Sequence, residues 1–193
     1  MSAEKQPKFA LLVVNMLNDM VKRGRPFPMP PEFKQNIIPR IKDFIDKCRQ
    51  KNIPIIYICD SHRPNDPEFT DFPKGVEHAV KGTTGADIID EVKPHKEDYI
   101  VTKRRFSGFF DTELELLLSE LGVDSVIMIG RPTNVCVLYT AADAFFRGFK
   151  VYAITDCLYS GTQTYHIMGL KNMFFAEQLK SDEFYRKFLQ VSI

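Results

Sequence analysis

Residues 125–155 read SVIMIGRPTNVCVLYTAADAFFRGFKVYAIT, and this stretch decides the fold class. Ser125–Ile129 and Lys150–Thr155 are short apolar runs, which is typical of strands buried in a parallel sheet. The residues between them favour a helix from near Asn134 to Arg147, and Gly148 is a suitable helix end. Strand, helix and strand in this order predict a βαβ unit with two parallel strands.

The same alternation extends along the chain on both sides of this unit. An amphipathic helix is predicted around Ile37–Cys48, with Pro39 near its first turn, and the long stretch Asp60–Gly85 is predicted as a loop. Thr112 and Glu115 form a capping-box signature before a leucine-rich helix that Gly122 ends. Further strands are expected at Phe9–Val14, Ile53–Cys59, Tyr99–Thr102 and Ala176–Lys180, and further helices at Ala86–Val92, at Thr164–Phe174 and from Asp182 onward.

Strands that alternate with helices over 193 residues indicate an α/β protein with a parallel sheet covered by helices on both faces. Because no repeat, low-complexity tract or linker interrupts the pattern, residues 1–193 are expected to form a single domain.

Composition excludes several classes of function. A net charge of +1 gives no global attraction to nucleic acid or to anionic membranes, and no apolar run is long enough to span a bilayer. The apolar stretch near the N-terminus is short and lacks a cleavage site, which favours a strand over a signal peptide. The four cysteines are Cys48, Cys59, Cys136 and Cys157, and no two of them form a CxxC pair. This spacing predicts a reducing compartment, with the cytoplasm as the default.

Ligands of such sheets bind at the carboxyl ends of the strands. Cys136 follows one strand and is predicted to lie in the first turn of a helix, where the helix dipole lowers a thiol pKa; Lys103, at the end of another strand, could add a positive charge. The alternative is a buried structural cysteine. Asp60, His62 and His78 have the right atoms for zinc or iron, although solvated loop histidines are the alternative.

Four segments together resemble the isochorismatase-like cysteine hydrolases, which include nicotinamidases and N-carbamoylsarcosine amidases. Their order and spacing agree over nearly the whole chain. The segments are ALLVVNMLNDM at 10–20, YICDSHRPNDPEF at 57–69, HAVKGTTGAD at 78–87 with KRRFSGFFDTELELLL at 103–118, and GRPTNVCVLYTAADAFFRGFKV at 130–151.

The resemblance implies a three-layer sandwich around a six-stranded parallel sheet in the order 3-2-1-4-5-6. It implies an Asp–Lys–Cys triad in which Cys136 is the nucleophile, Lys103 the lysine, and position 15 the carboxylate. It also implies self-association and, for nicotinamidases, a metal that orients the substrate; Asp60, His62 and His78 match its ligands.

Two positions depart from the family pattern. Position 15 is Asn15, and an amide cannot serve as the general base. The family's cis peptide falls between Arg131 and Pro132, and proline offers no N–H to an oxyanion, so the N–H of Cys136 would remain as donor. Losing one such donor typically costs about 10²–10³ in rate.

The substrate pocket is less well defined by the sequence. Met20 and Phe72 lie near family positions that contact substrate, and Phe69 and Phe106 could complete an aromatic lining. Core packing is an equally good interpretation of these side chains.

Two functions remain open. The first is hydrolysis of a small amide, urea-like or carbamoyl compound through a Cys136 thioester. The second is a catalytically impaired relative that binds a small molecule or a protein, which Asn15 and Pro132 together favour. A redox role for the thiol, or vinyl-ether hydrolysis, is a minor alternative.

Overall fold

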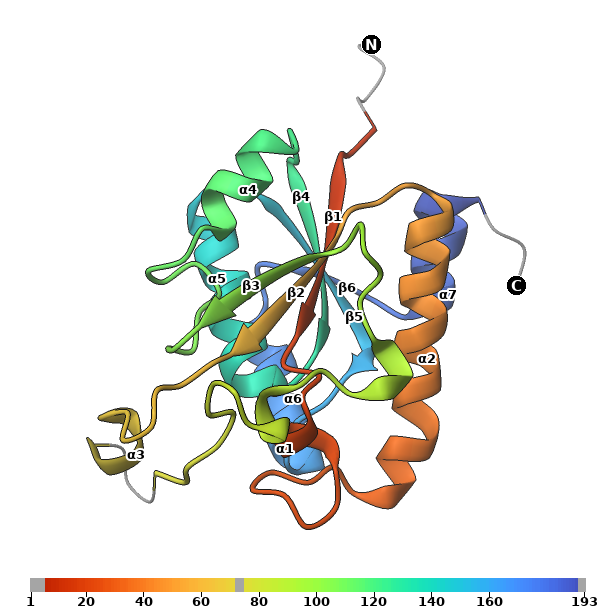
Figure 1. The fold of residues 1–193 in the computed structure, drawn as a ribbon. Helices are drawn as coiled ribbons and strands as arrows, with labels where there is room; N and C mark the ends of the chain where they lie inside the picture. Colours follow the sequence, from red (N-terminus) through yellow and green to blue (C-terminus); the bar gives the residue numbers. More distant parts are fainter. Residues whose placement is uncertain (1–5, 72–74, 191–193) are drawn as a thin grey trace.

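The computed structural model describes residues 6–71 and 75–190, apart from the side chains of residues 32, 33 and 71. A parallel sheet of six strands runs through it in the order β3-β2-β1-β4-β5-β6, which confirms the predicted fold class (Figure 1). The strands are β1 (Phe9–Val14), β2 (Ile55–Asp60), β3 (Tyr99–Lys103), β4 (Ser125–Gly130), β5 (Lys150–Leu158) and β6 (Glu177–Leu179).

Helices cover both faces of the sheet (Figure 1). One face carries α2 (Pro31–Gln50) and α7 (Ser181–Phe184), and the other carries α4 (Leu114–Glu120), α5 (Leu138–Phe146) and α6 (Gln163–Asn172). The short helices α1 (Asn18–Val21) and α3 (Glu68–Asp71) lie in loops beyond the carboxyl ends of the strands. No helix in the described ranges is both long and apolar enough to cross a membrane.

Successive residues of β1 point into different cores. Leu11 and Val13 pack with α2, whereas Leu12 and Val14 pack with α4 and α5. Because residues 10–14 are buried on both faces of the sheet, the sequence shows a continuous apolar run instead of an alternating one.

Helix α2 begins earlier than the sequence indicates. It starts at Pro31 instead of near Ile37, since a proline suits the first helical position. The prediction that Pro39 lies in the first turn is therefore wrong. Pro39 lies inside the helix on its exposed face, where solvent can bond the carbonyl that proline leaves unpaired.

Two other local predictions are wrong. Ala86–Val92 forms 3₁₀ turns and not a helix, because Ile88 makes an antiparallel bridge to Leu17. The predicted capping box does not form, because Glu113 and not Thr112 is the N-cap of α4. Thr112 Oγ1 accepts a bond from the Leu114 N–H at 3.2 Å, and Glu115 pairs with Arg147 at 2.7 Å.

Candidate active site

The loop after β4 carries Cys136. Gly130 has a φ of +105°, and a Cβ there would lie 2.2 Å from the carbonyl oxygen of Val14, so only glycine fits between these strands. The Arg131–Pro132 peptide bond that follows is cis. Thr133–Val137 then form a π-helical turn, in place of the first turn of an α-helix, and α5 starts only at Leu138.

The predicted catalytic side chains lie together at the carboxyl ends of the strands. The Nζ atom of Lys103 lies 3.4 Å from the Sγ atom of Cys136 and forms a close ion pair with the Oδ1 atom of Asp60. Lys103 also donates to the carbonyl oxygen of Arg105 at 2.9 Å. All three side chains are buried, so their charges interact through a medium of low dielectric constant.

The side-chain amide of Asn15 forms two hydrogen bonds with Asp60. Its Nδ2 atom donates to Asp60 Oδ2 at 2.7 Å, and its Oδ1 atom accepts from the Asp60 backbone N–H at 2.9 Å. Asn15 is fully buried and has a φ of +49°, a conformation that asparagine tolerates better than most residues. An aspartate at position 15 would place a second carboxylate next to that of Asp60, and the two negative charges would repel each other.

The charge states differ from the sequence prediction. Burial raises the pKa of the Cys136 thiol to about 12; Lys103 opposes this shift and Asp60 adds to it. The expectation of a lowered thiol pKa is therefore wrong for this structure, because desolvation outweighs the neighbouring cation. Burial alone would lower the pKa of Lys103, but Asp60 and Cys136 together raise it above its usual range. Lys103 is therefore a cation beside a neutral thiol.

Asp60, His62 and His78 fit a metal ion. Their ligand atoms all lie within 4.8 Å of one another. Both ring nitrogens of His62 are buried without a hydrogen-bond partner, as expected of a side chain that ligates a metal ion. Val76 O lies 2.5 Å from Nδ1 of His78, which leaves Nε2 of His78 facing Asp60 at 3.9 Å.

Asp66 is a residue that the sequence analysis missed. Its Oδ2 atom is buried without a hydrogen bond and lies 3.6 Å from Nδ1 of His62. Its other oxygen accepts from the backbone N–H of Glu68 at 3.1 Å and faces Arg105 at 3.4 Å. Its position four residues after His62 was the only available signal, and the sequence gives no indication that the carboxylate is buried.

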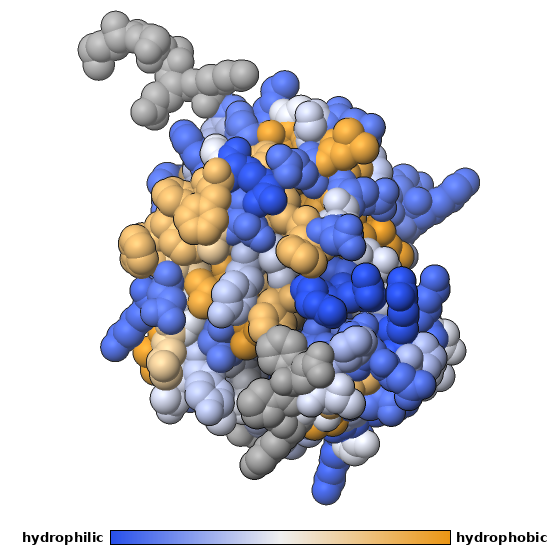
Figure 2. All heavy atoms as spheres, turned by 90° about the vertical axis from the view of Figure 1, so that its left-hand side faces the viewer, coloured by the Kyte–Doolittle hydropathy of each residue, from blue (hydrophilic) through white to orange (hydrophobic). Residues whose placement is uncertain are grey.

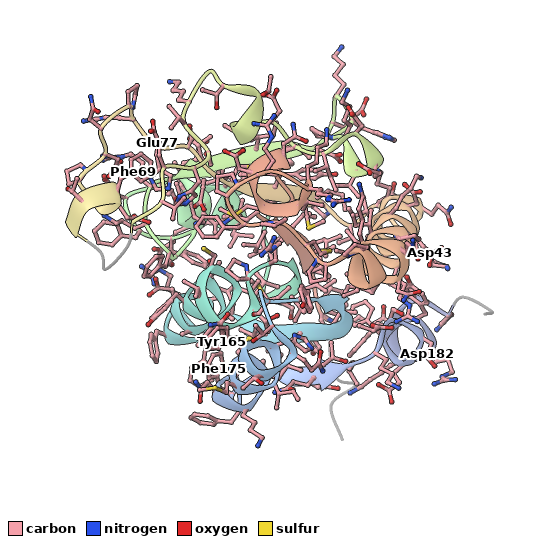
Figure 3. All side chains as sticks on the ribbon, turned by 90° about the horizontal axis from the view of Figure 1, so that it is seen from below. Asp43, Phe69, Glu77, Tyr165, Phe175 and Asp182 are labelled. Carbon is pink, nitrogen blue, oxygen red and sulfur yellow. The ribbon has the colours of Figure 1, made fainter. Side chains whose placement is uncertain are left out.

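The aromatic residues divide between the site and the core. The Phe69 ring lies 5.1 Å from that of His62 and 5.6 Å from that of His78, measured between ring centroids. Figure 3 looks onto this end of the sheet and shows Phe69 at its edge, beside Glu77. Met20 is buried in the core, Phe106 stacks on Tyr139, and Phe72 lies outside the described residues.

Asp19 holds the loop that carries His78. Its Oδ2 atom accepts from the Ala79 N–H at 2.9 Å, and Arg25 lies 3.4 Å from Oδ1. Gly85 packs against the same carboxylate, since a Cβ there would lie 2.0 Å from Oδ2. These contacts assign Asp19 a structural role.

The sequence profile of the Isochorismatase domain matches residues 9–183. The chain belongs to this family. It is 30% identical over 182 residues to a protein of Arabidopsis thaliana named a probable inactive nicotinamidase, and the match covers 89% of this chain and 92% of the relative.

Solved structures agree with this family assignment. The N-carbamoylsarcosine amidase of Thermoplasma acidophilum is 31% identical with a TM-score of 0.80, and the match covers 91% of this chain and 98% of that one. The pyrazinamidase of Pyrococcus horikoshii, solved in complex with zinc, is 30% identical with a TM-score of 0.81, covering 90% and 99%.

Proposed function

We propose that this protein, acting as one domain, is a cysteine hydrolase that cleaves the C–N bond of a small amide or carbamoyl compound. The observation that carries the proposal is the 3.4 Å contact between Lys103 Nζ and Cys136 Sγ in a buried site. The amidases among its structural relatives support the substrate class.

Cys136 would attack the carbonyl carbon, and a C–S bond would replace the C–N bond. The thiol proton would leave with the nitrogen as ammonia or an amine, and water would then cleave the thioester and restore the thiol. Lys103 would stabilise the negative charge that develops on sulfur in this low-dielectric site. Since Lys103 is a cation and Asn15 is an amide, neither can accept the thiol proton.

A divalent metal, zinc or iron, would be held by Asp60, His62 and His78. When bound, it would act as a Lewis acid that orients the substrate. His62 remains neutral and able to bind metal because burial lowers its pKa.

A second candidate function is binding without turnover. Three observations favour it: the Asn15 amide is committed to Asp60, the Cys136 thiol has a raised pKa, and Pro132 lacks the N–H that an oxyanion would need. A relative named as inactive has a similar sequence. The ligand would then be a small molecule or a protein partner.

Ammonia release from a panel of small amides and carbamoyl compounds, nicotinamide included, tests the two functions. We expect the parent protein to hydrolyse at least one compound slowly and Cys136→Ala to abolish this turnover. An Asn15→Asp variant that is faster than the parent would identify position 15 as the missing base. If neither the parent nor Asn15→Asp releases ammonia, the hydrolase proposal is rejected in favour of binding.

We also propose a cytoplasmic protein that forms a homo-oligomer and acts on small molecules instead of nucleic acid or membranes. All four cysteines are free thiols, which suits a reducing compartment. The exposed Phe146 and Phe174 side chains supply apolar surface for self-association. Light scattering during size-exclusion chromatography would test this, and a monomeric mass would contradict it.

A further inference from the structure

A basic pocket lies at the outer edge of the sheet, where β2 and β3 end. Its volume is about 340 Å³, which is within the range of small-molecule sites. Five cationic residues line it, together with two hydroxyl residues; they are Arg63, Lys81, Lys103, Arg104, Arg105, Ser61 and Thr102. Asp111 is the single acidic residue in this lining. Figure 2 shows this side of the molecule, with strongly hydrophilic residues gathered next to apolar ones.

Lys103 borders both the pocket and the candidate active site, and the neighbouring side chains of the same segments divide between the two. Asp60 and His62 are buried at the site, whereas Arg63 is exposed and Ser61 is partly exposed. The Lys103 ammonium is buried against Asp60, while the preceding Thr102 is exposed. This alternation follows from extended backbone, in which successive side chains point to opposite faces. Cys136 does not line the pocket.

The positive charge in the pocket is only partly balanced. Arg105 lies 3.4 Å from both Asp66 and Glu68, and Arg104 lies 3.9 Å from Asp111. The side chains of Arg63 and Lys81 form no ion pair with any residue in the ranges 6–71 and 75–190. The net charge of the whole chain is only +1, so this excess is local.

We infer that this pocket binds a small multivalent anion carrying phosphate or carboxylate groups. Arg63 and Lys81 supply unpaired donors, and the Ser61 and Thr102 hydroxyls can donate further bonds to the same oxygens. A concave site of this size favours a small molecule over a polymer backbone, which would need a long basic stripe. The inference does not rest on the proposed hydrolase activity.

Isothermal titration calorimetry with inorganic phosphate and, separately, with citrate would test the inference. We expect saturable binding of at least one of them, which weakens as salt is added. Arg63→Ala and Lys81→Ala should each weaken it by about tenfold, because each removes one charge-assisted contact. Both residues are exposed, and circular dichroism would confirm that the variants fold.

Two controls locate the binding. Lys96→Ala removes an exposed lysine that is not part of the lining, and Cys136→Ala alters the candidate active site; both should bind as the parent does. Binding of phosphate alone would assign a phosphoryl ligand, and binding of citrate alone a carboxylate ligand. Absence of saturable heat with either anion, or binding that Arg63→Ala and Lys81→Ala leave unchanged, would overturn the inference.

Discussion

At the scale of single residues, the Asp60 carboxylate is the centre of the candidate site. One oxygen pairs with the Lys103 ammonium, and the other accepts from Asn15 and faces His78 at 3.9 Å. Asn15 therefore holds Asp60 in one orientation between the cation and the metal ligands. A substitution at position 15 would disturb both parts of the site at once.

Asp66→Asn should weaken zinc binding by about 10–100-fold. The Asp66 carboxylate lies 3.6 Å from His62 Nδ1, so it favours the tautomer that carries its proton on Nδ1 and leaves the other ring nitrogen for the metal. An amide would not select this tautomer as strongly. Competition with a chromophoric chelator would measure the affinity.

His62→Ala should weaken binding further than Asp66→Asn, and His95→Ala, which removes an exposed histidine, should have no effect. Equal affinity of Asp66→Asn and the parent would show that Asp66 does not position His62.

The sequence predicted which residues lie together at the site, but it did not predict the pKa of the Cys136 thiol. Asp60, His62, Lys103 and Cys136 could be placed because each lies at or after the end of a strand, and strand ends meet at one edge of a parallel sheet. The raised thiol pKa could not be predicted, since it depends on water excluded by residues distant in the sequence.

At the scale of elements, α6 supports the turn that carries Cys136. Thr133 Oγ1 and His166 Nδ1 lie 2.9 Å apart, and in the segment before α6 Ser160 Oγ accepts from the N–H of Asn134 at 3.3 Å. Gly169 allows the helix to lie directly on the turn, since a Cβ there would be 2.7 Å from the backbone nitrogen of Asn134.

Gly169→Ala should destabilise the protein by about 1–3 kcal/mol, because the added methyl group would force α6 away from the π-helical turn. Gly161→Ala is the matched control, since a Cβ at Gly161 meets nothing within 4 Å. Urea unfolding would measure both. If Gly169→Ala and Gly161→Ala were equally stable, the close packing of α6 on the turn would not be what makes glycine necessary at position 169.

Strands were easier to predict than helix boundaries. The buried strands β1, β2 and β4 lie within two residues of their predicted limits, because each is a short apolar run. The π-helical turn at Thr133–Val137 was missed, since contacts from α6 and β4 decide its geometry and local propensity does not.

At the scale of the whole molecule, the four buried thiols make stability depend on pH. Burial raises the pKa of each cysteine, to about 12 for Cys59 and Cys136, whereas an unfolded thiol titrates near 9.0. The contribution of the buried thiols to the free energy of unfolding is fully present at pH values below the pKa of an unfolded thiol. As pH rises above it, the unfolded state loses protons that the native state keeps, so the stability falls.

The free energy of unfolding should therefore decrease between about pH 8 and pH 10.5, by up to about 1.4 kcal/mol per pH unit for each buried thiol. Cys48→Ala should reduce this slope by the share of one thiol, because Cys48 is fully buried. Urea titrations at several pH values would measure it. A free energy that does not change over this range would refute the prediction.

The central place of β1 affects how the chain folds during synthesis. One edge of β1 pairs with β2, but the other pairs Phe9 with Ser125 and Leu12 with Met128, so this second edge must wait for a partner more than a hundred residues later. Until β4 leaves the ribosome, FALLVV is an uncharged apolar segment that other nascent chains could pair with. Lys8, immediately before it, can act as a charged gatekeeper. We expect this protein to depend on chaperones early in its synthesis and to complete its sheet only late.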